Sequence, residues 1–237
     1  MNERLIEIRR AEERSHNEIY STFELFAPGS WLAKPVRTVL ELLPLFDGAS
    51  SFCALDLGCG VGRNSIPIAQ YFQNRPCRVD CVDILASAID KLHQNAQRYG
   101  TEASIQGHAT AIEEFPIPAG QYDLILAVSA LEHVSSKECF ITVLQAIRSG
   151  LRPGGIACLI VNTNVTEHDK ISGVPLPPQF EVIVSADEFF HTADRIFSGC
   201  RTLKHSIVHQ KYDITRENGV AALETDVVTC VFRNNNL

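Results

Sequence analysis

The sequence predicts an α/β protein with a doubly wound, mostly parallel sheet of seven strands, preceded by helices and finished by an antiparallel hairpin. Three observations predict it: apolar runs alternate with helical patterns through residues 51–197, glycines follow the first run, and two alternating runs close the chain. The 237 residues, 45% hydrophobic and 21% charged, suffice for one domain with a full core.

The first 50 residues predict an N-terminal helical cap, and residues 51–237 predict the main domain. Helical spacing of apolar residues predicts helices over 3–20, 36–46, 62–72, 85–100, 136–151 and 185–197. Apolar runs predict strands over 51–57, 77–84, 103–107, 122–130, 156–164, 200–214 and 221–233. Turn residues predict a turn at 152–155, a hairpin turn at Asn218-Gly219, and a loop over the carboxyl edge of the sheet at 164–181.

Charge and cysteine content narrow the classes of partner. The formal net charge is −7 and no lysine or arginine run offers a surface for a phosphate backbone, so a small molecule is the expected partner and nucleic acid is not. No apolar run has the length of a membrane span and the charged N-terminus does not resemble a secretory signal, which predicts a cytoplasmic protein without a membrane partner. Eight cysteines without ligand spacing predict buried reduced thiols and no metal site.

The stretch ALDLGCGVGRNS places three glycines two residues apart, directly after a predicted strand. Such a junction lets a ligand approach the backbone and presents the free N–H groups of a helix start. The dinucleotide fingerprint has its third glycine where this chain has Arg63, and Asp56 before the glycines suits a cationic group better than a phosphate. The residues favour a ligand with a cationic group over a pyrophosphate, and an NAD(P)-dependent oxidoreductase is the main rival.

This stretch resembles the D-x-G-x-G-x-G motif of the class I S-adenosylmethionine-dependent methyltransferases. The resemblance covers roughly residues 50–235 by element order and implies a Rossmann-like fold, S-adenosyl-L-methionine as cofactor and methyl transfer as the reaction. The cofactor-binding residues that it implies are Asp56, Gly58, Gly60, Gly62, Arg63, Asp83, Ile84, His108, Ala109, Thr110 and Val128.

The resemblance also implies a role for the acidic positions. Asp56 would face the charged amino group of the cofactor, directly or through water. Asp83 ends the second predicted strand, where an acid of the family accepts both ribose hydroxyls. His108 stands where the family often has an aspartate for the adenine amino group, so the adenine contacts are expected to pass to Ala109 and Thr110.

The stretch YDLILAVSALEHV resembles the fourth strand of the family, with small residues facing the cofactor and a Glu-His pair beyond them. With GCGVGRNS and the closing hairpin, it is most similar to the tellurite-resistance and thiopurine-type methyltransferases. That similarity implies a small-molecule methyl acceptor such as a thiol or a metalloid oxyanion. A soft acceptor of this kind needs no general base, whereas a hydroxyl or a protonated amine needs one.

Five residues are candidates for contact with the reacting groups. His133, at the end of the fourth predicted strand, is the candidate base, and the alternative is that it only caps the following turn. His168, in the predicted loop, and His191 are candidate substrate contacts, against the alternatives of a solvated loop residue and a partly buried histidine. Tyr20 and Trp31 either close over the cofactor or pack inside the cap. A non-catalytic cofactor-binding module acting through a partner protein is the second rival.

Overall fold

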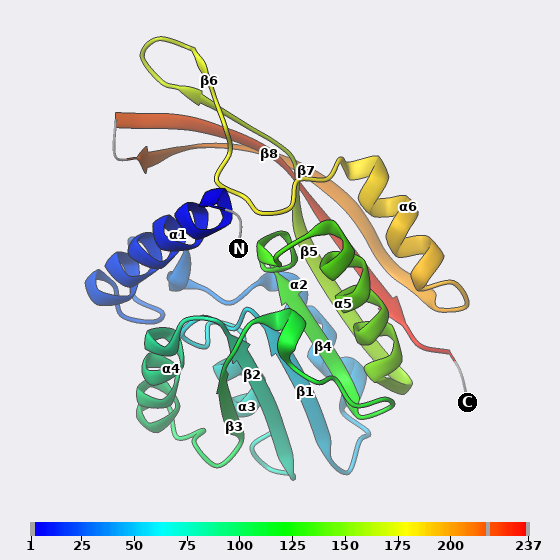
Figure 1. Ribbon diagram of the computed structural model, residues 1–237. Coiled ribbons are helices and arrows are strands. Elements are labelled where there is room, and N and C mark those ends of the chain that lie inside the picture. The colour runs from blue at the N-terminus through cyan, green and yellow to red at the C-terminus, as the bar shows by residue number, and fades with distance from the viewer. Residues whose placement is uncertain (1–2, 217–218, 236–237) are drawn as a thin grey trace.

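The computed structural model describes residues 3–216 and 219–235, and Figure 1 shows their path. The helices are α1 (Glu3–Thr22), α2 (Arg37–Leu42), α3 (Ser65–Tyr71), α4 (Ala86–Arg98), α5 (Lys137–Gly150) and α6 (Ala186–Ile196). The strands are β1 (Phe52–Leu57), β2 (Cys77–Asp83), β3 (Ile105–Ala109), β4 (Tyr122–Val128), β5 (Leu151–Asp169), β6 (Pro175–Leu176), β7 (Arg201–Arg216) and β8 (Gly219–Arg233). Short 3₁₀ helices are η1 (Trp31–Ala33), η2 (Leu43–Phe46), η3 (Ile112–Glu114) and η4 (Leu131–His133).

The strands form one sheet in the order β3-β2-β1-β4-β5-β8-β7, with β6 paired to β5 outside this path. The first five strands of that order are parallel, β8 is antiparallel to both of its neighbours, and β7 therefore runs in the direction of β5. Parallel strands bring their carboxyl ends to one edge, where ligands bind in open α/β sheets. The predicted fold class is confirmed, including the closing antiparallel hairpin, which leaves β8 as the one antiparallel strand along this path.

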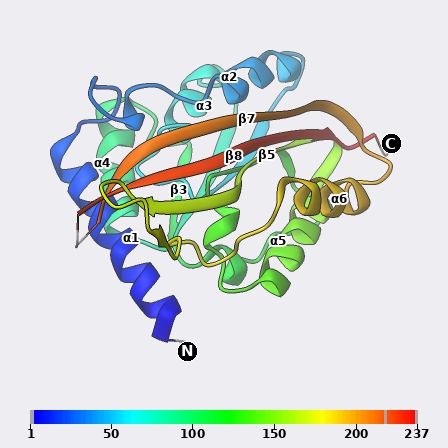
Figure 2. The ribbon, with the colours of Figure 1, turned by 90° about the horizontal axis from the view of Figure 1, so that it is seen from above.

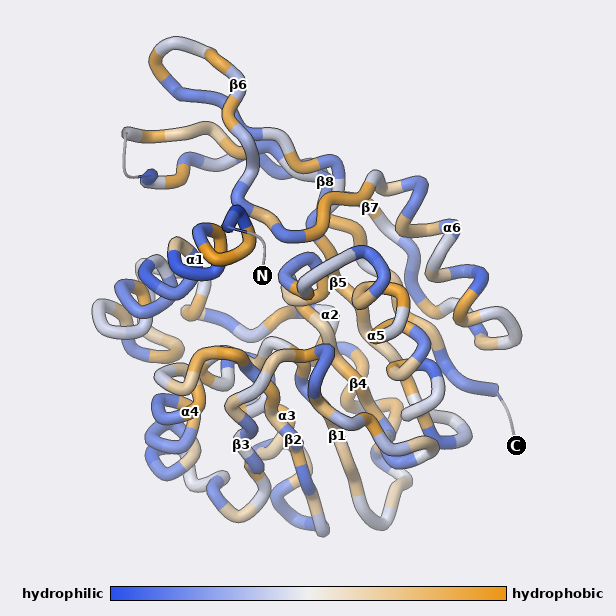
Figure 3. Tube along the Cα trace, viewed as in Figure 1, coloured by the Kyte–Doolittle hydropathy of each residue, from blue (hydrophilic) through white to orange (hydrophobic). Residues whose placement is uncertain are grey.

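Helices cover both faces of the sheet, with α2 and α3 on one side and α5 and α6 on the other (Figure 2). The central strands are hydrophobic along their length, whereas α1 is mainly hydrophilic (Figure 3). In β4 every residue is buried, and successive side chains enter opposite cores. Leu124 and Leu126 pack on the α3 side, and Ile125 and Ala127 pack on the α5 side. This is why the strand reads as a continuous apolar run rather than an alternating one.

Serine side chains fix where two of the helices begin. Ser136 accepts a hydrogen bond from the N–H of Cys139 at the start of α5, and Ser185 accepts one from Glu188 at the start of α6. These bonds satisfy backbone donors that a helix start leaves free. Both helices then bury one face, and Phe140 of α5 meets Phe189 of α6 with ring centroids 6.0 Å apart.

The structure corrects the prediction for residues 164–181. Instead of ending at 164, β5 continues to Asp169, pairs with β8 up to the Asp169–Ala221 pair, and pairs with β6 at His168–Pro175. We call the projecting part of these strands, residues 164–176, 205–216 and 219–226, the arm. It extends beyond the rest of the sheet and lies above α1 in Figure 1. Buried and exposed residues alternate in this segment because one face of the arm packs on Phe180, in a small cluster with Val165 and Leu223, while the other face is exposed.

Two predicted turns have different outcomes. Residues 152–155 lie within β5, where the pairing with β4 shifts between Tyr122 and Leu124, so this segment is a bulge rather than a turn. The hairpin between β7 and β8 is confirmed by their antiparallel pairing, which reaches Arg216–Gly219, while Asn218 of the predicted turn lies outside the described residues. Within the described ranges, no helix is long and apolar enough to cross a membrane.

Candidate active site

The glycine turn after β1 is held in a conformation that other residues rarely adopt. Gly58 has φ +72° and Gly60 has φ +53°, in the left-handed region that favours glycine. A Cβ atom on Gly58 would lie 2.4 Å from Cβ of Ala130, and one on Gly60 would lie 2.9 Å from Oη of Tyr20. Gly62 has φ +95°, and a Cβ atom on it would lie 2.7 Å from Cδ1 of Leu92. The turn is therefore closely packed against the segment after β4 and against α1.

Two predicted carboxylates flank this turn. Asp56, 1% exposed at the end of β1, accepts a hydrogen bond of 2.6 Å from Oγ of Ser65. Burial raises the pKa of Asp56 to about 6, against the lowering effects of Ser65 and Arg63. Asp83 closes β2, and its two oxygens each accept one backbone N–H at 2.9 Å, from Gly60 and from Leu85. Burial raises the pKa of Asp83 as well, although these two N–H groups oppose the shift.

The residues predicted to read an adenine ring lie at the ends of β2 and β3. Ile84 is 49% exposed directly after Asp83, and Ala109 is exposed at the end of β3. The N–H of Thr110 donates to the carbonyl of Asp83 at 2.9 Å and ties the two strand ends together. His108 lies against Phe115, with ring centroids 5.0 Å apart, and its Nε2 is buried 3.6 Å from Asp80. The edge of the His108 ring that carries Nε2 is thus buried inside the fold.

The face of α1 that meets the sheet edge carries Glu12, His16 and Tyr20, spaced four residues apart. Nδ1 of His16 lies 3.3 Å from Oε2 of Glu12, and the His16 ring is 5.6 Å from that of Tyr20 and 6.1 Å from that of Trp31. Burial opposes the charge on both groups, but their mutual interaction lowers the pKa of Glu12 and raises that of His16. Sequence reasoning missed Glu12 and His16, although their spacing on one helix face was a usable signal.

Tyr20 and Trp31 lie beside the glycine turn, where Tyr20 packs in the core, and their predicted closure over the cofactor stays a prediction. Tyr20 is buried, and burial raises its pKa far above the usual value. Trp31 is 42% exposed and lies under the guanidinium of Arg63, whose Cζ is 4.9 Å from the ring centroid. Nη1 of Arg63 also donates to the carbonyl of Trp31 at 3.1 Å. Arg63 therefore joins the glycine turn to the N-terminal segment.

His133 lies in η4, just beyond Val128 at the buried end of β4. Its Nδ1 is 2.9 Å from Oε2 of Glu181, and its ring stacks on Phe180 at 5.3 Å. Burial alone would lower the pKa of His133, but the hydrogen bond to Glu181 and the nearby carboxylates outweigh it and raise the pKa to about 9. A ring that is protonated at neutral pH cannot accept a proton. This argues against the predicted role of His133 as a base in this arrangement.

Ionic contacts tie α1 to the segment around His133. Arg9 lies 3.3 Å from Glu113 and 3.7 Å from Glu181, and Arg4 donates to the carbonyl of Phe180 at 3.1 Å. On the arm, Arg216 donates to Oε1 of Gln179 at 2.6 Å and makes two 2.7 Å contacts with Glu167. The segment 178–184 is thereby held between α1 and the arm, over the end of β4.

Glu132 is fully buried beside His133. Its Oε1 accepts from the backbone N–H of Asn162 at 3.1 Å and from Nδ2 of Asn162 at 2.6 Å, whereas Oε2 is buried without a hydrogen-bond partner. Burial raises the pKa of Glu132. Sequence reasoning treated Glu132 only as the neighbour of His133, because sequence alone does not show which carboxylate oxygens find partners.

The structure does not bring His168 and His191 to this group of residues. His168 lies on the arm, paired with Ala222 of β8 and with Pro175 of β6. It lies six positions after Asn162 in β5, which is at most about 20 Å at the usual strand rise. His191 is exposed on α6. Neither histidine supports the predicted role of a substrate contact.

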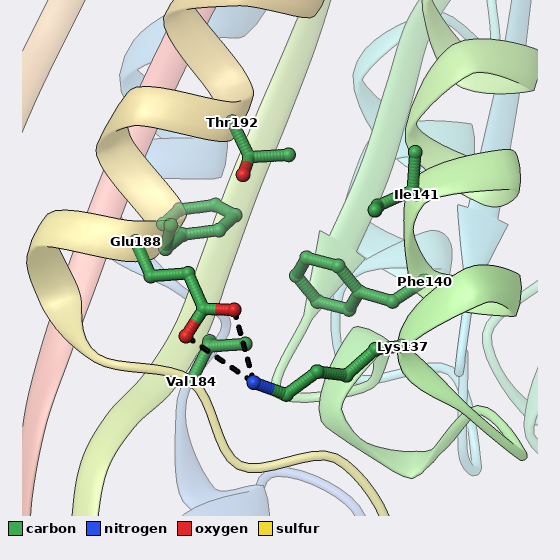
Figure 4. Close-up of a pocket in the computed structure, with 7 residues that line it drawn as sticks. Lys137, Phe140, Ile141, Val184, Glu188 and Thr192 are labelled. Atoms are coloured by element: carbon green, nitrogen blue, oxygen red, sulfur yellow. Dashed lines mark hydrogen bonds and ion pairs between the residues drawn. The ribbon is translucent and has the colours of Figure 1, made fainter.

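A cavity of about 50 Å³ lies elsewhere, between α5 and α6, where Phe140 and Phe189 contribute to its lining. Figure 4 shows Lys137 bridging to Glu188 at one end of the lining residues, with Thr192 and Ile141 at the other end. No predicted site residue lines it. The candidate active site is therefore the glycine turn, the ends of β2 and β4, and the covering face of α1.

The residues present at this edge fit S-adenosylmethionine. The left-handed conformations of Gly58 and Gly60 turn the backbone between the two carboxylates, and buried Asp56 supplies negative charge beside the turn. Asp83 keeps acceptor capacity beyond its two backbone bonds, because a carboxylate accepts about four hydrogen bonds. These two carboxylates, as hydrogen-bond acceptors, suit a cationic amino group and a diol, and they are unfavourable for a pyrophosphate.

Residues 54–155 match the methyltransferase domain family. This chain carries a class I S-adenosylmethionine-dependent methyltransferase domain. The chain is 30% identical over 135 residues to the tRNA N(3)-cytidine methyltransferase METTL2 of Mus musculus, a match that covers 54% of this chain and 34% of that relative. The chain spans less than half the length of the first curated relatives that it matches. The predicted family is confirmed, and with it S-adenosylmethionine as the cofactor of the domain.

Solved structures share the architecture of the methyltransferase domain. The N-methyltransferase NodS of Bradyrhizobium japonicum, in complex with S-adenosyl-l-homocysteine, has a TM-score of 0.58 at 16% identity over 94% of this chain and 98% of that chain. TehB of Haemophilus influenzae has a TM-score of 0.58 at 19% identity over 82% of this chain and 61% of that chain. At these identities the likeness shows the fold alone.

Proposed function

We propose that this chain transfers the methyl group of S-adenosylmethionine to a small-molecule acceptor. One observation carries the proposal: the N–H of Gly60 is fixed by Asp83 at 2.9 Å, directly beside buried Asp56. This arrangement joins an acceptor for a diol to a negative charge for an amino group across one glycine turn. Residues 1–50 act as a cap over the catalytic domain in this proposal.

The charges around the site favour a small acceptor over nucleic acid. The net charge is −7, and the basic side chains of the arm face acidic partners: Lys170 with Asp213, Lys211 with Glu224, and Arg216 with Glu167. Paired cations offer little to a phosphate backbone, whose binding depends on free lysine and arginine. The match to a tRNA methyltransferase makes transfer RNA the comparison substrate in the test.

When bound, the cofactor supplies an electrophilic methyl group and a neutral leaving group. The residues of the chain hold the reactants and exclude water. Tyr20 and Trp31 cover the glycine turn, Asp83 orients the nucleoside end, and the segment from Val128 to His133 borders the position of the acceptor. Protonated His133, held by Glu181, favours electron-rich groups near it.

The test is a methyl-transfer screen with labelled S-adenosylmethionine over thiols, tellurite and selenite, amines, phenols, carboxylates and unmodified transfer RNA. Transfer to a small molecule supports the proposal, and transfer confined to RNA contradicts it. Calorimetric titration with S-adenosylhomocysteine and with NADH separates the oxidoreductase alternative, which predicts heat from NADH alone. Tight cofactor binding with no transfer to any acceptor would favour a non-catalytic module.

A further inference from the structure

We propose that Glu132 accepts the proton of the methyl acceptor, and that the acceptor is consequently an amine or a hydroxyl compound rather than a thiolate or an oxyanion. This inference rests on the proposed function and specifies its substrate class. It starts from the geometry of a single carboxylate, one of whose oxygens is bonded twice while the other has no partner.

The two oxygens of Glu132 have different surroundings. Oε1 accepts two hydrogen bonds from Asn162, which fix the orientation of the carboxylate. Oε2 is buried and has no hydrogen-bond partner, and the residue as a whole is 1% exposed. A buried carboxylate oxygen is normally satisfied, because leaving it without a donor costs free energy. A ligand that brings an N–H or O–H group would satisfy Oε2.

Glu132 belongs to the segment that borders the methyl-transfer position. Two residues before it, Ala130 lies so close to the glycine turn that a Cβ on Gly58 would be 2.4 Å from that of Ala130. Ser129, between β4 and this segment, has φ +49°, which is uncommon outside glycine. The chain leaves the strand in a strained conformation and turns η4 toward the cofactor side of the sheet edge.

The groups that surround Glu132 come from two other elements, α1 and β7, and from η4 itself. Three groups lie near enough to interact electrostatically with Glu132: Glu12 of α1, Tyr212 of β7 and the adjacent His133. The pKa of Tyr212 is raised first by burial and then by the charges of Glu132 and Glu12. His133 also feels the fields of Glu12 and Glu132. The carboxylate of Glu132 therefore lies between η4, α1 and the arm.

The neighbouring charges leave Glu132 as the available base. His133 is bonded to Glu181, and Glu12 is paired with His16. Asp56 is bonded to Ser65, and Asp83 holds two backbone N–H groups. Glu132 alone among these carboxylates combines full burial with a buried oxygen that accepts no hydrogen bond from the described residues.

The chemistry balances with an N–H or O–H acceptor. The lone pair of the acceptor forms the new bond to the methyl carbon, the carbon–sulfur bond breaks, and its electron pair stays on sulfur. The proton of the acceptor passes to Oε2 of Glu132 and later to solvent. An acceptor that is already an anion has no proton to give and would meet the charge of Glu132 at close range, so this site disfavours it.

The experiment compares wild type with Glu132→Gln, which preserves the size of the side chain and the acceptor for Asn162. The matched control is Glu188→Gln, which removes a carboxylate on α6. Binding of S-adenosylhomocysteine, kcat, KM and the pH dependence of kcat are measured on the amine or phenol that the screen identifies. We expect Glu132→Gln to bind the product within about 3-fold of wild type, to lose about 10²–10⁴-fold in kcat, and to lose the acidic limb of the pH profile.

Two results would overturn the inference while leaving the proposed function intact: preferential methylation of thiols or tellurite by wild type, or a Glu132→Gln variant with kcat within about 3-fold of wild type. If wild type methylates no compound of the screen, the proposed function itself fails. Should Glu132→Gln fail to fold, the wild-type profile decides, because a carboxylate base requires kcat to fall at acidic pH as the base is protonated, and a flat profile contradicts it.

Discussion

Replacing Gly58 by alanine puts a methyl group where Ala130 already lies, with 2.4 Å between the two Cβ atoms. Gly120 provides the matched control, because its φ of +64° is similar to the +72° of Gly58 and a Cβ there meets nothing within 4 Å. Both substitutions carry the cost of a left-handed conformation, about 1–2 kcal/mol, offset by about 0.4–1 kcal/mol from the stiffer unfolded chain. Only Gly58→Ala adds overpacking, about 1–3 kcal/mol.

We therefore expect Gly120→Ala to cost about 1 kcal/mol of unfolding free energy and Gly58→Ala to cost about 2–4 kcal/mol. For a chain of this size, that lowers Tm by about 3 °C and by about 5–12 °C respectively. Thermal and urea unfolding followed by circular dichroism measure both. Equal losses for the two variants would refute the close approach of the glycine turn to the segment after β4, and with it the packing on which the site depends.

Three further predictions concern charge and the single tryptophan. Burial raises the pKa of Asp56 to about 6, so its ionisation destabilises the fold as pH rises from about 4 through 6. Asp56→Asn should therefore gain about 1–2 kcal/mol of unfolding free energy at pH 8, measured by urea unfolding, and should bind S-adenosylhomocysteine more weakly. A loss of stability at pH 8 would contradict the burial argument. Because the pKa of His133 is raised to about 9, its charge contributes stability that is complete below about pH 6.5 and is lost as pH rises through 9. Glu181→Gln should lower this pKa, measured by NMR titration of the ring protons of His133. An unchanged titration midpoint would count against the ion pair. Trp31 is the only tryptophan and lies beside the glycine turn, so S-adenosylhomocysteine should change its fluorescence in wild type, and a silent titration at saturating ligand would place the ligand elsewhere.

The parallel core of the fold could be predicted from sequence because buried strands read as apolar runs. Tyr122–Val128 is apolar in nearly every position, since its two faces enter two cores. The arm could not be predicted in the same way. Its β5 segment carries Thr166, His168 and Asp169 with prolines and glycines close behind, which is the composition of a loop. Its strand conformation is imposed by pairing with β8, a partner that is distant in the sequence.

The site was predictable where residues lie at strand ends and not where helices and loops cover them. Asp56 and Asp83 were found from their positions after apolar runs, and the structure links Asp83 to Gly60. The positions of His168 and His191, away from the strand ends, could not be predicted because distance along the chain says little about distance in space. Glu12 and Glu181 were missed because a charged side chain reads as solvated surface until its partner, His16 or His133, is known.

The central claim is that the bend between Asp56 and Asp83 binds the nucleoside and amino acid ends of S-adenosylmethionine. Isothermal titration of S-adenosylhomocysteine into wild type and Asp83→Asn tests it most directly, with NADH as the competing ligand. The account predicts saturable binding of S-adenosylhomocysteine to wild type, at least 10-fold weaker binding to Asp83→Asn, and no heat from NADH. Unchanged affinity in a folded Asp83→Asn variant, or heat from NADH alone, would contradict it.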